Sequence, residues 1–308
     1  MGMYCTKCQI KNEEDLFLGN FIQQKKSLQS EENLDESQEI ASSILVEIIH
    51  QVCPPQTNSK KSLDEMRQLK QVFRKEKANS ADFYETEELY FEDQSKFIGK
   101  IEKNQANGEG KLWLQNGDYY EGNFCNNLMH GKGLYKYNSG TTYEGDFLNN
   151  KPDGFGIEIQ INGSIYKGTF KGGKKDGFGY FKWQQGCQYE GEWKHNNING
   201  KGKYDWPDGR SYVGDWVENQ MHGRGKYSWK DGKCYNGEYQ FDRKQGFGIF
   251  YWPDGKQYKG YWMDGKQHGN GMMIYLDGKK KVGEWNNGQF IHCIENGDID
   301  IIAQNWIQ

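Results

Sequence analysis

The sequence predicts an all-β repeat array: short antiparallel hairpins joined into an elongated, twisted meander, preceded by a short helical or disordered region. Three observations predict this fold: a spacing of 23 residues that recurs from residue 97 to about residue 290, aromatic residues at alternate positions, and a turn dipeptide at the end of each unit. Composition separates the two regions, because 38 of the 40 glycines lie beyond residue 96 and all 10 tryptophans lie beyond residue 112.

Each unit opens with the pattern aromatic-x-Gly-x-aromatic, and we count positions within a unit from this first aromatic residue, position 0. The opening tyrosine recurs every 23 residues without an insertion, at Tyr120, Tyr143, Tyr166, Tyr189, Tyr212, Tyr235 and Tyr258. A weaker copy opens at Phe97, and a half copy follows at Lys281-x-Gly283-x-Trp285. Residues 97–290 therefore contain eight full repeats and one partial repeat.

The remainder of each unit predicts two strands and a turn. A glycine pair such as Gly200 and Gly202 is followed by aromatic residues at alternate positions, such as Tyr204 and Trp206. Alternation of period two is typical of strands, and it places the aromatic residues and glycines on one face and the charged residues on the other. The dipeptides Asp-Gly and Asn-Gly, as at Asp208-Gly209, favour a tight hairpin turn.

Glycines on the aromatic face leave room for rings to lie over the backbone. A single hairpin cannot bury such a face, so we expect stacked units to form a continuous aromatic spine. We predict that this spine is also the binding surface of the array. Its residues are Tyr143, Tyr166, Tyr189, Trp193, Trp206, Tyr212, Trp216, Trp229, Trp252, Tyr258 and Trp262.

One unit departs from the pattern. After Gly154 and Gly156, the apolar residues Ile157, Ile159 and Ile161 fall on the opposite parity from the usual aromatic residues. We therefore expect a local β-bulge in this unit.

The motif resembles that of the MORN (membrane occupation and recognition nexus) repeat family. Residues 212–216 (Tyr-Val-Gly-Asp-Trp), 222–225 (His-Gly-Arg-Gly) and 231–232 (Asp-Gly) are a near-ideal copy of the family pattern. The resemblance covers about 190 residues, roughly residues 97–290. It implies a meander of β-hairpins that serves as a binding scaffold. Some MORN arrays are attached to kinase or methyltransferase domains, but no segment outside this array is long enough for either.

Charge and cysteine usage narrow the class of protein. Residues 97–308 contain 27 basic and 25 acidic residues, and this near neutrality argues against a nucleic-acid partner. The seven cysteines are odd in number, and the three inside the array (Cys125, Cys187 and Cys234) take different repeat positions, so they predict no disulfide ladder. The N-terminus has no apolar segment typical of a signal peptide, and no apolar run predicts a transmembrane helix. We therefore expect a reducing, cytoplasmic location.

The first eight residues, Met-Gly-Met-Tyr-Cys-Thr-Lys-Cys, fit the pattern for N-myristoylation, in which removal of Met1 exposes Gly2. Cys5 and Cys8 lie where palmitoylation commonly accompanies it. Gly2, Cys5 and Cys8 are therefore the predicted lipidation sites. The alternative is a disordered tail with an incidental Cys-x-x-Cys. A zinc site would need a second ligand pair, which the sequence lacks, so we predict no metal and no cofactor.

The chain before and after the array divides into short segments. Residues 1–34 are expected to be a disordered tail, residues 35–80 two helices, residues 81–96 a linker or cap, and residues 291–308 a C-terminal cap. The first helix is predicted by one apolar face (Ile40, Ile44, Leu45, Ile48, Ile49 and Val52) and the second by a capping box at Ser62-x-x-Glu65. The second helix carries a basic face, which either is solvated or contacts anionic lipid or an acidic partner.

No catalytic motif is present. The sequence contains no phosphate-binding loop, zincin motif, nucleophile elbow or kinase signature, so it predicts no enzyme and no catalytic residue. His130, His222 and His268 precede a glycine at one repeat position, and this recurrence indicates a structural role in a loop. A recurrent acidic row at position 3 is expected on the solvent face; it comprises Asp146, Glu192, Asp215, Glu238 and Glu284.

Three functions are compatible with these features. The first is an acyl-anchored scaffold that binds protein partners at the cytosolic leaflet of a membrane or at the cortical cytoskeleton. The second is a soluble cytoskeletal subunit, for instance in a cilium or axoneme. The third is a phospholipid head-group-binding module or a regulatory module of a lipid kinase, which the near-neutral array disfavours. A homodimer is compatible with each.

Overall fold

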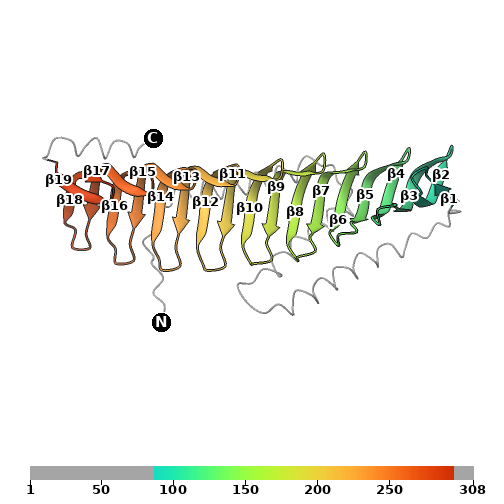
Figure 1. The fold of residues 1–308 in the computed structure, drawn as a ribbon. Helices are drawn as coiled ribbons and strands as arrows, with labels where there is room; N and C mark the ends of the chain where they lie inside the picture. Colours follow the sequence, from blue (N-terminus) through green and yellow to red (C-terminus); the bar gives the residue numbers. More distant parts are fainter. Residues whose placement is uncertain (1–86, 295–308) are drawn as a thin grey trace, which may run out of the picture. The chain divides into compact units, whose positions relative to one another are not determined.

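The computed structural model describes residues 87–294, and between these limits the chain forms 19 strands. Each strand pairs in antiparallel fashion with the next strand in the chain, so the sheet is an open meander whose edges are β1 and β19 (Figure 1). The strands are β1 (Glu87–Tyr90), β2 (Lys96–Glu102), β3 (Gln105–Trp113), β4 (Tyr119–Cys125), β5 (Leu128–Lys136), β6 (Thr142–Leu148), β7 (Lys151–Ile159), β8 (Ile165–Lys171), β9 (Lys174–Lys182), β10 (Gln188–Lys194), β11 (Asn197–Asp205), β12 (Ser211–Val217), β13 (Gln220–Ser228), β14 (Cys234–Gln240), β15 (Arg243–Tyr251), β16 (Gln257–Met263), β17 (Lys266–Ile274), β18 (Lys280–Asn286) and β19 (Gln289–Cys293). This all-β meander is the predicted fold class.

The array extends slightly beyond the predicted repeats at both ends. β1 lies inside the segment expected to be a linker or cap, and it pairs with β2. β18 and β19 form a last hairpin from the partial repeat. The lipidation motif at Gly2, Cys5 and Cys8 and the helices expected over residues 35–80 lie outside the described residues.

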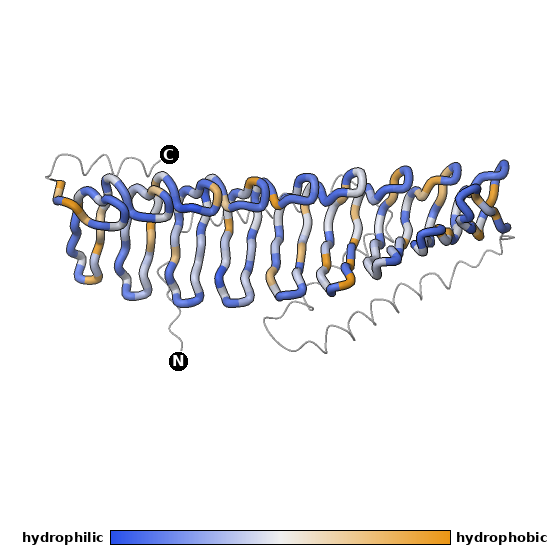
Figure 2. The backbone as a smooth tube through the Cα atoms, viewed as in Figure 1, coloured by the Kyte–Doolittle hydropathy of each residue, from blue (hydrophilic) through white to orange (hydrophobic). Residues whose placement is uncertain are grey.

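The ends of the strands form the two long edges of the array, which are distinct from the edge strands β1 and β19, and these long edges carry different turns. One edge carries the Asp-Gly loops: at the loop of residues 206–210, the Gly209 amide donates to the Trp206 carbonyl (3.1 Å) and the Trp206 amide donates to the Arg210 carbonyl (2.9 Å). Only the glycine of this loop has a positive φ, +88° for Gly209. The other edge carries two-residue turns with positive φ at both residues, for example His195 and Asn196 (49° and 72°). Both rows of turns are mostly hydrophilic (Figure 2).

The two-residue turns have no recognisable sequence pattern, and the sequence analysis did not identify them. Both positive φ values define the primed turn type that matches the strand twist. Asparagine and glycine are frequent in them, but Glu218 and Phe241 also adopt the positive φ. The nine turns comprise residues 103–104, 126–127, 149–150, 172–173, 195–196, 218–219, 241–242, 264–265 and 287–288.

A β-bulge recurs in every full repeat. In the pairing of β10 with β11, Gly191 lies opposite Gly202 and Trp193 lies opposite Ile198, so the register shifts between these pairs. Gly200, in the shifted segment, has a φ of +68°, which explains the first glycine of the Gly-x-Gly pair. The repeat that opens at Tyr143 has the same shift as the others. The bulge expected there is therefore a general feature, and the departure of that unit lies in its side chains.

The second glycine of the pair has a different cause. Gly202 lies directly under the ring of Tyr189, and a Cβ atom at this glycine would overlap that ring. The Tyr189 hydroxyl then donates to the Glu192 carbonyl (3.0 Å). Every opening tyrosine makes this bond to the residue three positions later; the donors are Tyr120, Tyr143, Tyr166, Tyr189, Tyr212, Tyr235 and Tyr258.

The inner layer of the core is a continuous series of aromatic rings. Each opening tyrosine contacts the position 4 ring of its own repeat and of the next repeat edge to face; Tyr189, for example, contacts Trp193 (ring centroids 5.4 Å apart) and Trp216 (5.8 Å). Such edge-to-face pairs stabilise beyond the area that they bury, by about 0.5–1.5 kcal/mol each. The series links every repeat to both neighbours.

A backbone clip also joins consecutive repeats. The Asn150 amide of one two-residue turn donates to the Met129 carbonyl of the preceding repeat (3.0 Å), and the Asn150 side chain accepts from the Met129 amide (2.8 Å). The side-chain acceptor recurs at Asn127, Asn196, Asn219 and Asp242. Where the preceding repeat has Pro152, which has no amide hydrogen to donate, the turn residue is Gly173 and only the backbone bond remains (2.8 Å).

Candidate binding face of the repeat array

The predicted binding spine divides into two groups by burial. Three of its residues, Trp206, Trp229 and Trp252, are half-buried and reach solvent. The other eight are buried: Tyr143, Tyr166, Tyr189, Trp193, Tyr212, Trp216, Tyr258 and Trp262. These eight fill the interior of the array, so their role is packing. The prediction that the spine binds a partner stays a prediction, and only the first group has side chains available for it.

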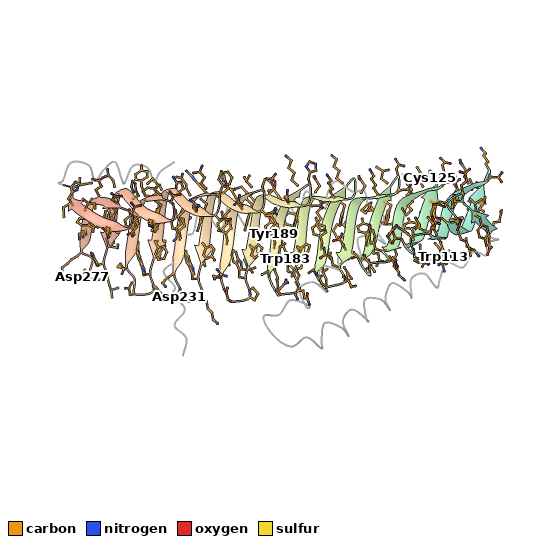
Figure 3. The ribbon with its side chains drawn as sticks, viewed as in Figure 1. Trp113, Cys125, Trp183, Tyr189, Asp231 and Asp277 are labelled. Atoms are coloured by element: carbon orange, nitrogen blue, oxygen red, sulfur yellow. The ribbon has the colours of Figure 1, made fainter. Side chains whose placement is uncertain are left out.

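The half-buried tryptophans belong to an outer aromatic row formed by positions 15 and 17 of the repeats. Eight rings follow one another with centroids 4.4–5.5 Å apart: Phe181, Trp183, Tyr204, Trp206, Tyr227, Trp229, Phe250 and Trp252. Trp183 lies closer than Tyr189 to the edge with the Asp-Gly loops (Figure 3). The outer row is thus an aromatic strip beside that edge, in which Phe181, Tyr227 and Phe250 are buried and the tryptophans of position 17 reach solvent.

Cations lie over the rings of this row. The Arg210 guanidinium lies 5.3 Å from the Trp206 ring, and the Lys256 ammonium lies 4.7 Å from the Trp252 ring. Both cations also pair with a loop carboxylate, Asp208 at 2.7 Å and Asp254 at 3.9 Å. The row therefore combines aromatic surface with cationic groups that are themselves paired with loop carboxylates.

The unit that opens at Tyr143 interrupts the outer row. Glu158 and Gln160 occupy positions 15 and 17, where aromatic residues are usual. The Glu158 carboxylate pairs with the Lys175 ammonium (2.8 Å), and both side chains are largely buried. Lys175 occupies position 9 of the next repeat and lies 5.1 Å from the Tyr166 ring. Glu158, paired with Lys175, and Gln160 thus replace the two rings that other repeats have at these positions.

Lys244 occupies the same repeat position as Lys175 but has different neighbours. Its ammonium lies 4.8–5.2 Å from the centroids of four rings: Trp229, Tyr235, Phe250 and Trp262. Burial lowers the pKa of Lys244 to about 8. The sequence analysis did not identify this residue; a lysine at a repeat position that is otherwise mostly uncharged was the available signal.

Four acidic side chains at position 3, which were expected only to face solvent, accept hydrogen bonds from backbone amides. The Asp215 carboxylate accepts a hydrogen bond from the Arg224 amide (3.0 Å) and pairs with Lys201 (2.7 Å). The acceptors of the equivalent bulge amides in other repeats are Asp146, Glu192 and Glu238. These carboxylates therefore satisfy amides that the bulge removes from the strand ladder.

The three recurrent histidines lie in strands, and the loop position expected for them is wrong. His130, His222 and His268 are the third residues of β5, β13 and β17. At the same repeat position, the side chains of Asn107, Asp153, Asp176 and Gln245 accept an amide from the neighbouring two-residue turn. In the histidine repeats the Nδ1 atom is buried and makes no hydrogen bond. The histidines thus recur at a strand position whose side chains face the neighbouring two-residue turn in other repeats.

Within residues 87–294, no three His, Cys, Asp or Glu side chains lie together as metal ligands would. The same part of the chain contains no helix of the length and hydropathy needed to cross a membrane.

The repeat geometry agrees with the family assignment from sequence. The MORN repeat matches eight consecutive segments, 97–119, 120–142, 143–165, 166–188, 189–209, 212–234, 235–257 and 258–280. Together they cover more than half of the chain. The chain belongs to the MORN repeat family. In this MORN protein, the family's Tyr-x-Gly and Gly-x-Gly residues are those that place rings on the backbone and form the bulge.

Comparisons with other known proteins add little to this assignment. No curated protein sequence matches the MORN chain. Among solved structures, the TCP domain of Drosophila melanogaster SAS-4 (dCPAP), in complex with a proline-rich motif of Ana2 (dSTIL), has 10% identity and a TM-score of 0.31, over 67% of this chain and 94% of that one. The G-box domain of the microcephaly protein CPAP has 15% identity and a TM-score of 0.27, over 66% and 100%. A virginiamycin B lyase from Staphylococcus aureus has 12% identity and a TM-score of 0.14, over 64% and 69%. These values support no inference about function.

Proposed function

We propose that this MORN protein is a non-enzymatic scaffold whose repeat array binds protein partners through the outer aromatic row. One observation carries this proposal: eight consecutive rings, from Phe181 to Trp252, form one strip with cations over three of its tryptophans. Aromatic residues and arginine are the residue types enriched at protein interfaces. Such a row also needs no conformational change to accept a partner, which lowers the entropic cost of binding.

The binding role is tested by replacing Trp206 and Trp229 with glutamine. Gln160 already occupies this repeat position, so the fold is expected to tolerate the change. Proximity labelling with the Trp206→Gln, Trp229→Gln double variant should lose the partners that the wild-type chain labels. Tyr261→Asn, on the opposite face, is the matched control because Asn123 holds the equivalent position. An unchanged set of labelled partners in the double variant would refute the proposal.

We further propose that the scaffold is tethered to the cytosolic leaflet of a membrane by acylation at Gly2, Cys5 and Cys8. A single myristoyl chain binds membranes only weakly and reversibly, with an association constant of about 10⁴ M⁻¹. A stable anchor therefore needs the second acyl signal that Cys5 and Cys8 would carry. Lys7 and Lys11 would add about 1 kcal/mol each at an anionic leaflet, and the neighbouring Glu13, Glu14 and Asp15 oppose them.

Membrane fractionation tests the anchor. Gly2→Ala should abolish membrane association, whereas the Cys5→Ser, Cys8→Ser double variant should retain weak, exchangeable binding. If Gly2→Ala leaves the membrane fraction unchanged, the acyl anchor is wrong, and a soluble cytoskeletal or ciliary subunit becomes the better proposal. Proximity labelling with the Gly2→Ala chain then identifies the compartment.

A further inference from the structure

Two of the eight repeats place a lysine at position 9, where the others place residues that carry no charge. The other residues at this position are Ala106, Met129, Pro152, Ile198, Met221 and Gln267. Ala106, Met129 and Ile198 are buried in the core. Lys175 and Lys244 therefore each place an ammonium group at a position that is apolar in most other repeats. A charge that is partly removed from water needs an opposite charge or hydrogen bonds in compensation.

The chain itself compensates one of these lysines. The Lys175 side chain is only 11% exposed, and its ammonium pairs with the Glu158 carboxylate at 2.8 Å. The rings of Tyr166, Phe170 and Phe181 surround the same ammonium at 5.1–5.9 Å. This repeat shows how the fold accommodates a lysine here: aromatic rings around the ammonium and one carboxylate from position 15 of the preceding repeat.

Lys244 has the rings but lacks the carboxylate. Tyr227 occupies the place that Glu158 has before Lys175, 17 residues upstream in both cases, and its hydroxyl oxygen accepts a hydrogen bond from Arg210 (3.2 Å). Burial is the sole cause that lowers the pKa of Lys244, to about 8. Between residues 87 and 294, no acidic group offsets that effect. The ammonium thus lies among two rings of the outer aromatic row (Trp229 and Phe250) and two of the inner layer (Tyr235 and Trp262), with no carboxylate of the described residues beside it.

We propose that Lys244 and the rings of Trp229, Tyr235, Phe250 and Trp262 form a receiving site for one acidic side chain of a protein partner. The inference rests on the proposed protein-binding function and names the chemistry of the partner. The partner segment carries an aspartate or glutamate between apolar residues. Its carboxylate takes the place relative to Lys244 that Glu158 takes relative to Lys175, while its apolar neighbours cover the outer row.

A carboxylate suits this site better than a phosphate group. A phosphate is usually bound by several donors, often in a fork geometry. The two other cations over the outer row, Arg210 and Lys256, already pair with Asp208 and Asp254. The half-buried ammonium of Lys244 remains, and the chain's own example at Lys175 shows that a single carboxylate matches a lysine at this position.

Selection from a random dodecapeptide library against the full-length chain tests the site. We expect the selected peptides to share one acidic position flanked by apolar residues. Replacing that acid by its amide should weaken binding by about tenfold or more, as expected for a charge-assisted hydrogen bond in a partly desolvated site. The selection is repeated with Lys244→Met, for which Met129 and Met221 provide the precedent at the same position.

Two further variants make the test specific. Tyr227→Glu should supply Lys244 with an internal carboxylate, as Glu158 does for Lys175, and should abolish the preference for an acidic peptide. Lys256→Met removes a neighbouring cation over the same row and should leave the preference intact. If Tyr227→Glu does not fold, the acid preference of the peptides is compared between Lys244→Met and Lys256→Met alone, and this comparison is sufficient to test the receiving site.

The outcomes separate this inference from the proposed function. Peptides selected with no acidic position, or with one that Lys244→Met leaves unchanged, would overturn the receiving site while supporting a protein-binding array. Failure to select any peptide would contradict both. Selected peptides whose acid dependence disappears in Lys244→Met and persists in Lys256→Met would support both.

Discussion

At the scale of single residues, the array depends on rings placed directly on backbone. Trp216, at position 4, is 4% exposed, contacts the rings of Tyr189 and Tyr212 edge to face, and donates its indole N–H to the Gly202 carbonyl (3.2 Å). A truncation here removes contacts with two repeats at once. Its effect therefore exceeds that of an equally large side chain at the margin of the sheet.

Trp216→Ala should lower the free energy of unfolding by about 3–5 kcal/mol, the usual range for truncating a buried aromatic residue. Chemical denaturation followed by circular dichroism measures this loss. Trp206→Ala, in the half-buried outer row, should cost clearly less, so equal losses for the two variants would contradict the assignment of inner and outer rows.

Asp215, next to Trp216, should contribute more than an exposed side chain ordinarily does. From alternation alone, a surface change at this position would be expected to cost under about 0.5 kcal/mol. Because its carboxylate accepts the Arg224 amide, we now expect Asp215→Ala to cost about 1–2 kcal/mol. Asp215→Asn keeps an acceptor and should cost less than half as much in the same denaturation experiment. Equal losses for the alanine and asparagine variants would show that the amide bond is unimportant.

Lys244 should make stability depend on pH. Burial lowers its folded-state pKa to about 8, and an unfolded lysine has a pKa of about 10.4. Between these values the unfolded chain binds more protons, so the folded state gains stability from this residue as the pH rises. Lys244→Met should therefore be more stable than wild type by about 1–2 kcal/mol near pH 7, and the difference should shrink between pH ~8 and pH ~10. Denaturation of both chains across this range measures it, and a constant difference would contradict the prediction.

At the scale of elements, each two-residue turn both reverses the chain and attaches its hairpin to the preceding one. The Asn150 side chain accepts the Met129 amide at 2.8 Å, while its φ of 68° is a conformation that glycine adopts freely. The chain offers an internal comparison, because Gly173 takes the equivalent place opposite Pro152, whose nitrogen cannot donate.

Asn150→Gly should therefore remove the side-chain clip without straining the turn, at a cost of about 0.5–1.5 kcal/mol. The reverse change, Gly173→Asn, gains no hydrogen bond and should alter stability by less than about 0.5 kcal/mol. Thermal unfolding of both variants measures the difference. A gain from Gly173→Asn as large as the loss from Asn150→Gly would show that turn propensity, and not the clip, is responsible.

At the scale of the whole array, every strand pairs only with its neighbours in the chain. Stability is then close to a sum of repeat and interface contributions, as in other solenoid-like proteins. At about 4.8 Å per strand, 19 strands should span roughly 85 Å. Solution scattering from a fragment of residues 84–294 should give a pair-distance distribution of an elongated particle. A near-spherical profile would contradict an open meander.

Much of this architecture could be predicted from the sequence by itself. The 23-residue period, the strand alternation and the Asp-Gly turns depend on residues close together in the chain. A tyrosine two residues before a glycine, followed by a second aromatic residue, encodes which face is buried wherever it occurs. The fold class, the repeat boundaries and the buried position of Trp216 follow from such local information.

The tertiary structure decided what depends on contacts between repeats. The two-residue turns arise where strands of 7 and 9 residues pair, and they have no fixed sequence pattern. The bulge between these strands is marked in the sequence only by the first glycine of the Gly-x-Gly pair. Which spine residues reach solvent and which side chains surround Lys175 and Lys244 depend on what the adjacent repeat supplies, whereas the amide bonds of the acidic row depend on the bulge within one repeat. Alternation assigns a side chain to a face of the sheet, but its burial and its charge partner are set by residues on other strands, such as Glu158 for Lys175, and these meet it only when the hairpins form and pair.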